Sequence, residues 1–222
     1  MPYKAVLFDL DGTLLDTLED LADSTNAALA ELGIPGHPLE AYKHLVGDGL
    51  ENLLRRALRQ EPPDEALLAR GIELTRREYA GRWANTSKPY PGIPDLLDRL
   101  SHQGIPMAVF SNKPDEFTRP CVTRLLSGWH FEAVQGATPE LPRKPDPRGA
   151  LAIASQMGIA PCEILYLGDT NTDMQTAVAA GMFPVGALWG FRTADELLAA
   201  GAAALVKTPA EVLDWILGAE RE

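Results

Sequence analysis

Two aspartates that directly follow a short apolar segment are the first residues of this chain whose types and spacing point to chemistry. Asp9 comes right after the apolar residues 5–8, and Asp11 stands two positions later, before Gly12, which lets the backbone turn sharply. Two carboxylates at this spacing repel each other unless a cation or a proton lies between them. A pair of helix-capping acids is the alternative, but one cap needs only one acid. The pair therefore favours a cation or a shared proton at this point.

Further polar side chains follow later apolar segments or precede later helices. They are Ser111 and Asn112 after residues 105–110, Lys144 before a predicted helix, and Asp169 with Asp173 after residues 164–167. Alone, each has an ordinary explanation, such as a turn, a solvated lysine or a helix cap. Three acids at one point call for a hard cation with oxygen ligands, most simply Mg²⁺. A hydroxyl, an amide and an ammonium beside it form a receptor for a phosphoryl group, and a carboxylate held there can act as the nucleophile.

The elements that must position these residues form an alternating pattern. Residues 5–8 predict a buried strand, because a short run of apolar residues is bounded by acids and a glycine. From residue 93 onward, predicted helices alternate with predicted strands, as in a parallel sheet. The strands are expected at residues 105–110, 131–134, 164–167, 183–188 and 204–206, and the helices at 93–102, 114–126, 145–157, 172–180 and 209–217. Parallel strands bring their carboxyl ends to one edge of a sheet, so the polar groups above should meet there.

The segment between residues 16 and 83 has a helical pattern with no convincing strand. Apolar residues at spacings of three and four predict helices over residues 18–32, 49–59 and 64–82, and Pro62 with Pro63 separates the last two. Three helices exceed what a single crossover between parallel strands requires. We therefore expect a doubly wound, Rossmann-like parallel α/β core formed by residues 1–15 and 88–222, with an inserted helical cap domain of residues 16–87.

Composition limits the partners of this chain. The 31 acidic residues outnumber the 20 basic ones, which disfavours nucleic acids and anionic membrane surfaces. No apolar run approaches a membrane span, and Asp9 and Asp11 interrupt the only apolar stretch at which a signal peptide could be sought. Cys121 and Cys162 form no CxxC pair, so we expect reduced thiols in a cytoplasmic protein. The oligomeric state stays open.

Four segments in this order resemble the motifs of the haloacid dehalogenase superfamily. They are DLDGTLLDT at residues 9–17, SNK at 111–113, KPDP at 144–147 and GDTNTD at 168–173. The helical insertion and the run WGFR at residues 189–192 resemble the phosphoglycolate phosphatase branch of that superfamily. The resemblance covers nearly the whole chain. It implies a Mg²⁺-dependent phosphatase that hydrolyses a small phosphomonoester, most simply 2-phosphoglycolate, through an aspartyl-phosphate.

The resemblance also implies a role for each matching catalytic residue. Asp9 would be the nucleophile, and Asp11 the general acid and then base, with its backbone carbonyl on the metal. This division agrees with chemistry, since a nucleophile must stay ionised whereas a general acid must hold a proton. Asp169 would complete the metal ligands Asp9, Asp11 and Asp169, and Asp173 would lie in or next to the layer behind them.

The phosphate-binding residues follow from the same resemblance. Ser111 and Asn112 would bind phosphate oxygens, and Thr13 would support the turn and hydrogen-bond the site. Lys144 would bind the phosphate and neutralise phosphorylated Asp9, so it counts as both a binding and a catalytic residue. Where the family often has serine after the last motif's first aspartate, this chain has Thr170, which keeps the hydroxyl.

Several alternatives remain open on the residues alone. A phosphomutase of the β-phosphoglucomutase kind uses the same core motifs, and pyrophosphate or a sugar phosphate could replace phosphoglycolate as the substrate. A phospho-accepting receiver domain is shorter and lacks a helical insertion, so a non-enzymatic switch is the weakest alternative. Within the helical segment, Lys43, Arg55 and Arg56 are candidates for a substrate carboxylate, although cations in such a segment are more often solvated.

Overall fold

The computed structural model describes residues 3–59 and 64–217, and its centre is a six-stranded parallel sheet. The strand order is β5-β4-β1-β6-β7-β8, so the first strand of the chain lies near the middle. The strands are β1 (Ala5–Phe8), β4 (Met107–Pro114), β5 (Ala133–Ala137), β6 (Ile164–Gly168), β7 (Phe183–Ala187) and β8 (Ala204–Val206). This arrangement confirms the doubly wound parallel α/β fold predicted from the sequence.

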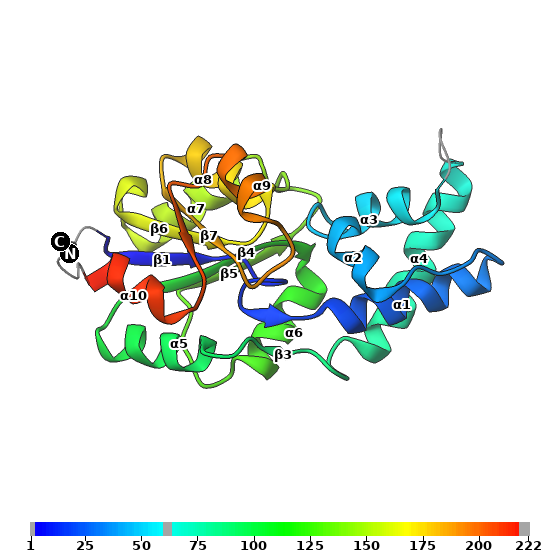
Figure 1. The fold of residues 1–222 in the computed structure, drawn as a ribbon, viewed down its shortest axis with the longest axis horizontal. Helices are drawn as coiled ribbons and strands as arrows, with labels where there is room; N and C mark the ends of the chain where they lie inside the picture. Colours follow the sequence, from blue (N-terminus) through cyan, green and yellow to red (C-terminus); the bar gives the residue numbers. More distant parts are fainter. Residues whose placement is uncertain (1–2, 60–63, 218–222) are drawn as a thin grey trace.

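Helices cover both faces of this sheet, which explains why its strands are apolar on both sides. In β1, Val6 and Phe8 pack into one hydrophobic cluster, whereas Ala5 and Leu7 pack into another on the opposite face. One face carries α5 (Ile93–His102), α6 (Asp115–Leu125) and α10 (Ala210–Leu217). The other carries α7 (Arg148–Met157), α8 (Asn171–Ala180) and α9 (Ala194–Ala199), as Figure 1 shows, and the 3₁₀ turn η1 (Pro161–Glu163) precedes β6.

Four helices between β1 and α5 form a separate layer beyond the carboxyl edge of the sheet (Figure 1). They are α1 (Leu18–Glu31), α2 (Leu39–Leu45), α3 (Leu50–Ala57) and α4 (Glu65–Arg82). They bury a further hydrophobic cluster, which includes Leu29, Tyr42 and Leu54 and is joined by Phe191 from the segment between β7 and α9. The side chain of Asp64 caps α4 by accepting hydrogen bonds from the backbone N–H groups of Ala66 and Leu67.

The two connections to these helices are joined to each other. The short strands β2 (Leu15–Asp16) and β3 (Lys88–Pro89) pair antiparallel. The buried carboxylate of Asp20 accepts hydrogen bonds from the backbone N–H and hydroxyl groups of both Thr86 and Ser87, at 2.6 to 3.2 Å. The segment that leads from the sheet to the inserted helices is therefore hydrogen-bonded to the segment that leads back to the sheet.

Several predicted boundaries differ from the structure. The sequence predicted three helices in the inserted segment, but a fourth, α2, is present between the first two. This helix is seven residues long and buries only Tyr42, so it lacks the apolar periodicity on which the prediction depended. The predicted strand at residues 131–134 lies two residues too early, and the one at 105–110 continues to Pro114. Pro62 and Pro63 lie outside the described residues. Along residues 3–59 and 64–217, no helix combines the length and apolar character that a membrane crossing requires.

Candidate active site

Three buried carboxylates meet at the carboxyl edge of the sheet. Strands β1 and β6 are neighbours in register, and the N–H of Asp9 donates to the carbonyl of Leu167 at 2.9 Å, so Asp9 and Asp169 end adjacent strands. Asp173 reaches the same point from the first turn of α8. Asp9, Asp169 and Asp173 each offer one oxygen, and these oxygens lie within 4.8 Å of one another. We call these three residues the acid cluster.

Lys144 supplies the positive charge beside the acid cluster. Its Nζ donates to Asp9 Oδ1 at 2.7 Å, to Asp173 Oδ1 at 2.7 Å and to the carbonyl of Phe110 at 3.0 Å. Asn112 holds the lysine in place, because its side chain accepts from the N–H of Lys144 and donates to the Lys144 carbonyl. Three carboxylates against one ammonium leave two negative charges without compensation, a balance that fits a divalent cation with oxygen ligands.

The electrostatics of the cluster follow from this imbalance. Burial and the charge of Asp173 raise the pKa of Asp9 to about 7, against the opposing effect of Lys144. Burial, Asp9 and Asp173 together hold the pKa of Asp169 well above its ordinary value. Although burial favours a neutral lysine, Asp173 and Asp9 raise the pKa of Lys144 above its usual range. A cation bound among these acids would therefore favour their ionised form.

Asp169 is held by a hydrogen bond on each of its two carboxylate oxygens. Its Oδ1 accepts from the Thr13 hydroxyl at 2.9 Å, and its Oδ2 accepts from the N–H of Phe191 at 2.8 Å. Gly12 adopts a φ of +92°, and a Cβ on it would lie 2.3 Å from Asp169 Oδ2, so only glycine fits at position 12. Thr13, which we expected to bind phosphate, thus positions an acid of the cluster in this structure.

Asp173 has two functions in the fold. Its Oδ2 accepts from the N–H and hydroxyl of Thr170 and closes a capping box at the start of α8. Its Oδ1 accepts from Lys144 and from the Tyr166 hydroxyl. From the sequence we expected Asp173 in or next to the layer behind the metal ligands, and in the structure one of its oxygens lies within 4.8 Å of oxygens of Asp9 and Asp169.

Asp11 points away from the acid cluster. Its carboxylate accepts from Lys113 Nζ at 2.8 and 3.1 Å and from the Thr17 hydroxyl at 2.8 Å. The Asp11 side chain keeps 17% of its surface exposed, and the residue lines the cavity between the sheet edge and the inserted helices. Its carboxylate therefore does not join the other acids, and the predicted contact of its backbone carbonyl with the metal stays a prediction.

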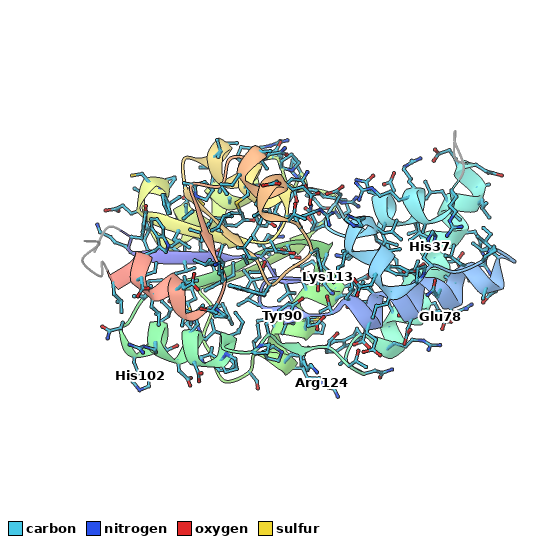
Figure 2. All side chains as sticks on the ribbon, in the orientation of Figure 1. His37, Glu78, Tyr90, His102, Lys113 and Arg124 are labelled. Carbon is cyan, nitrogen blue, oxygen red and sulfur yellow. The ribbon has the colours of Figure 1, made fainter. Side chains whose placement is uncertain are left out.

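Lys113 is the site residue to which the sequence assigned no role, although the SNK motif contains it. Figure 2 places it between the sheet and the inserted helices. Its Nζ donates to the Tyr79 hydroxyl of α4 at 2.6 Å as well as to Asp11. Burial favours the neutral form, but Asp11 and Tyr79 raise the pKa of Lys113. A lysine directly after two predicted phosphate-binding residues was the signal that could have identified it.

A cavity of about 650 Å³, counting the part open to solvent, lies between the sheet edge and the inserted helices. On the sheet side it is lined by Asp9, Asp11, Ser111, Asn112 and Lys113. Ser111 is buried and its Oγ accepts from the N–H of Lys113 at 3.2 Å. The predicted nucleophile Asp9, the predicted general acid Asp11 and two of the predicted phosphate-binding residues, Ser111 and Asn112, thus line one space, whereas Thr13 and Lys144 do not line it.

Comparison with known proteins identifies the family of this chain. The family model for haloacid dehalogenase-like hydrolases matches residues 6–187. The chain belongs to this family. A phosphoglycolate phosphatase of Pseudomonas putida is 38% identical over 192 residues, which cover 85% of this chain and 70% of that relative. A phosphoglycolate phosphatase of Chromobacterium violaceum is 34% identical over 214 residues, 95% of each chain.

A solved structure gives the same result for this haloacid dehalogenase-like hydrolase. A crystal structure from Lactobacillus delbrueckii subsp. bulgaricus, named as a candidate phosphoglycolate phosphatase, superposes with a TM-score of 0.94. The two sequences are 31% identical, and the match covers 99% of this chain and 100% of that one. The protein is thus a phosphatase of the haloacid dehalogenase superfamily, phosphoglycolate phosphatase-like in sequence and fold. Phosphatases of this family act on small phosphate esters and usually require a metal ion, which the acid cluster fits.

Proposed function

We propose that this chain hydrolyses 2-phosphoglycolate to glycolate and phosphate, with Mg²⁺ held by Asp9, Asp169 and the backbone carbonyl of Asp11. The acid cluster supports this most directly, because its uncompensated charge suits a divalent cation next to a carboxylate nucleophile. The matching relatives named phosphoglycolate phosphatase support the choice of substrate. When bound, Mg²⁺ would offset the repulsion between the carboxylate and the phosphate and stabilise the charge that develops during transfer.

The reaction proceeds in two displacements on phosphorus. A carboxylate oxygen of Asp9 forms a bond to phosphorus while the bond from phosphorus to the glycolate oxygen breaks, and Asp11 donates its proton to that oxygen. A water oxygen then bonds to phosphorus, Asp11 takes the water proton, and the bond from phosphorus to Asp9 breaks. Phosphate leaves and Asp9 regains its carboxylate. The position of Asp11 in front of the cluster, rather than within it, suits this exchange of protons.

The remaining residues stabilise charge and orient the phosphate. Lys144, at 2.7 Å from Asp9 Oδ1, compensates the negative charge that builds there. Ser111 lines the cavity and supplies a hydroxyl to the phosphate oxygens. Asn112 also lines the cavity, but its amide hydrogens bond to the carbonyls of Gly47 and Lys144, so in this structure its side chain positions Lys144. Thr13 acts indirectly, since its hydroxyl fixes Asp169.

We further propose that residues 16–87 are a cap domain over a core of residues 1–15 and 88–222. Two contacts support this role: the Asn112 side chain donates to the carbonyl of Gly47 at 3.3 Å, and Arg192 donates to the carbonyls of Val46, at 2.8 Å, and Lys43. Together they join the carboxyl edge of the sheet and the segment after β7 to α2 and the loop that follows it. A closed cap of this kind excludes bulk water from the cavity during phosphoryl transfer.

The test is phosphate release from 2-phosphoglycolate in the presence of Mg²⁺, with glycolate measured as the second product. Chelation should abolish turnover and added Mg²⁺ should restore it. Asp9→Asn keeps the shape of the side chain but removes the charge, and should lower kcat by about three orders of magnitude or more, while the circular dichroism spectrum stays unchanged. Asp214→Asn, an exposed aspartate on α10, is the matched control.

Turnover of Asp9→Asn within tenfold of the parent protein would contradict the covalent mechanism. If a phosphorylated sugar were converted to its isomer without release of phosphate, the protein would be a phosphomutase instead.

A further inference from the structure

The site contains a second buried ammonium besides Lys144, and this one lines the cavity. The Lys113 side chain is only 3% exposed, and its Nζ lies 4.7 Å from the centre of the Tyr79 ring. Lys144 is occupied on the phosphoryl side by Asp9 and Asp173. Lys113 instead lies beside Asp11, the proposed proton donor to the leaving group. The ammonium of Lys113 is therefore on the side of the site where the organic part of the substrate must lie.

Other cations near the site are engaged elsewhere. Lys43 pairs with Glu40, Arg55 pairs with Glu51 and Glu65, and Arg56 pairs with Asp48. None of these three cations, which the sequence left open as carboxylate ligands, lines the cavity. Arg76 does line it, but its side chain is half exposed and lies 3.8 Å from Glu116. Lys113 is thus the one buried cation among the described residues that line this cavity.

Two side chains of α4 that carry a hydroxyl group, Tyr79 and Thr75, line the same cavity as this ammonium. Tyr79 accepts from Lys113, and no described residue accepts the hydrogen of its hydroxyl. Thr75, one helical turn earlier, is 1% exposed, and its Oγ1 has no hydrogen-bond partner among the described residues. A buried hydroxyl without a partner is unfavourable, so a ligand that accepts from it gains affinity.

The rest of the cavity wall is apolar. Leu21, Leu50, Leu53 and Phe117 line it alongside these polar groups. In such surroundings a charge interacts strongly with its neighbours, and an anion that lacks a cationic partner is costly to bury. An ammonium in contact with one hydroxyl, with a second unpartnered hydroxyl in the same cavity wall, therefore suits a planar anion with two acceptor oxygens.

We propose that Lys113, with Tyr79 and Thr75 of α4, binds a carboxylate on the leaving group and thereby selects phosphate esters of small hydroxy acids. This inference rests on the proposed function and specifies how the substrate is recognised. It assigns the choice of substrate to a lysine of the sheet edge and two hydroxyls of the inserted helices, rather than to the exposed cations of α2 and α3.

The test compares kcat/KM for 2-phosphoglycolate with that for ethyl phosphate, which has a methyl group where the former has its carboxylate. In Lys113→Met, the ratio of the two should fall by about 100-fold, the value expected when a buried charge-assisted contact is lost. Any change in rate caused by the loss of the partner of Asp11 affects both substrates and cancels in the ratio. Tyr79→Phe keeps the pair of Lys113 and Asp11, and should lower the ratio by about fivefold. Lys43→Met is the matched control and should leave the ratio unchanged.

A parent protein that hydrolyses both esters equally well, or a Lys113→Met variant that retains the ratio, would overturn the inference. In either case the proposed phosphatase reaction would stand, because hydrolysis of ethyl phosphate and its loss in Asp9→Asn test that reaction separately.

A binding measurement extends the test to a protein without turnover. Calorimetric titration should show that 3-phosphonopropionate, which cannot be hydrolysed, binds the parent protein more tightly than propylphosphonate, and that Lys113→Met removes the difference. If the parent protein bound 3-phosphonopropionate and propylphosphonate equally tightly, the inference would be overturned. This outcome does not depend on whether the protein hydrolyses 2-phosphoglycolate.

Discussion

The acid cluster should make the metal-free protein less stable as the pH rises from 5 to 8, and Mg²⁺ should remove this loss. Burial and Asp173 raise the pKa of Asp9 from 3.8 to about 7. Between these two values the folded state holds a proton that the unfolded state has already released, so the free energy of unfolding falls as the pH increases. Above about pH 7 Asp9 is ionised in both the folded and the unfolded state, so its own contribution to the loss of stability ends.

The size of the effect follows from the shift. One pKa unit corresponds to about 1.4 kcal/mol, so the rise from 3.8 to about 7 amounts to about 4 kcal/mol in all. About 3 kcal/mol of this loss falls between pH 5 and pH 7, the part that the measurement covers. Asp169 adds to the effect in the same direction, because its pKa is raised too. Asp20 acts outside this range: burial alone would raise its pKa, but hydrogen bonds from Ser87 and Thr86 outweigh burial and lower it. The stability that Asp20 contributes is present above its unfolded pKa and is lost only below about pH 4.

The measurement is urea denaturation at pH 5, 6.5 and 8, with a chelator and then with excess Mg²⁺. The metal-free protein should lose stability across this range, whereas the Mg²⁺-loaded protein should not, since the cation favours the ionised acids. Asp9→Asn should lose most of the dependence on pH, and the surface variant Asp214→Asn should keep all of it. A metal-free protein that is as stable at pH 8 as at pH 5 would refute the argument from charge imbalance.

Two further predictions concern metal affinity and the connections to the inserted helices. Asp169→Ala should raise the Mg²⁺ concentration needed for half-maximal phosphate release by more than about tenfold; an unchanged titration would remove Asp169 from the metal ligands. Asp20→Ala should lower the free energy of unfolding at pH 7 by about 3 kcal/mol, because it leaves the N–H groups of Thr86 and Ser87 without their acceptor. Urea denaturation measures this loss, and Asp23→Ala, on the exposed side of α1, is the control; equal losses in the two variants would contradict the structural role of Asp20.

Most of the core could be predicted because its signals are local in the chain. Residues 5–8 and 164–167 are unbroken apolar runs, and the strands they predicted are fully buried in the sheet. Gly158 and Gly181 adopt the left-handed conformation directly after α7 and α8, where the predicted helices end. The short helix α2 was missed because only Tyr42 is buried in it, so no apolar stripe marks it in the sequence.

The positions of the acids could be predicted only in part. Asp9 and Asp169 were expected at one edge because each follows a strand, and parallel topology brings those strand ends together. The same reasoning put Asp11 with them, since it stands only two residues after Asp9. Its side chain instead turns toward Lys113 and Thr17, and Asp173 fills the third place in the cluster from the first turn of α8.

The amino-acid sequence was sufficient to predict the fold class, the family and the edge of the sheet at which the chemistry lies. Of the buried charge pairs, only Lys144 with Asp9 was implied by the resemblance, and the others became visible in the folded protein. Lys144 also meets Asp173 across 29 positions, Lys113 meets Asp11 across 102, and Lys113 meets Tyr79 across 34. Strands and helix ends are encoded by neighbouring residues, so the sequence reveals them. The partner of a buried charge depends on how whole elements pack and on where each side chain points, and no local pattern records either.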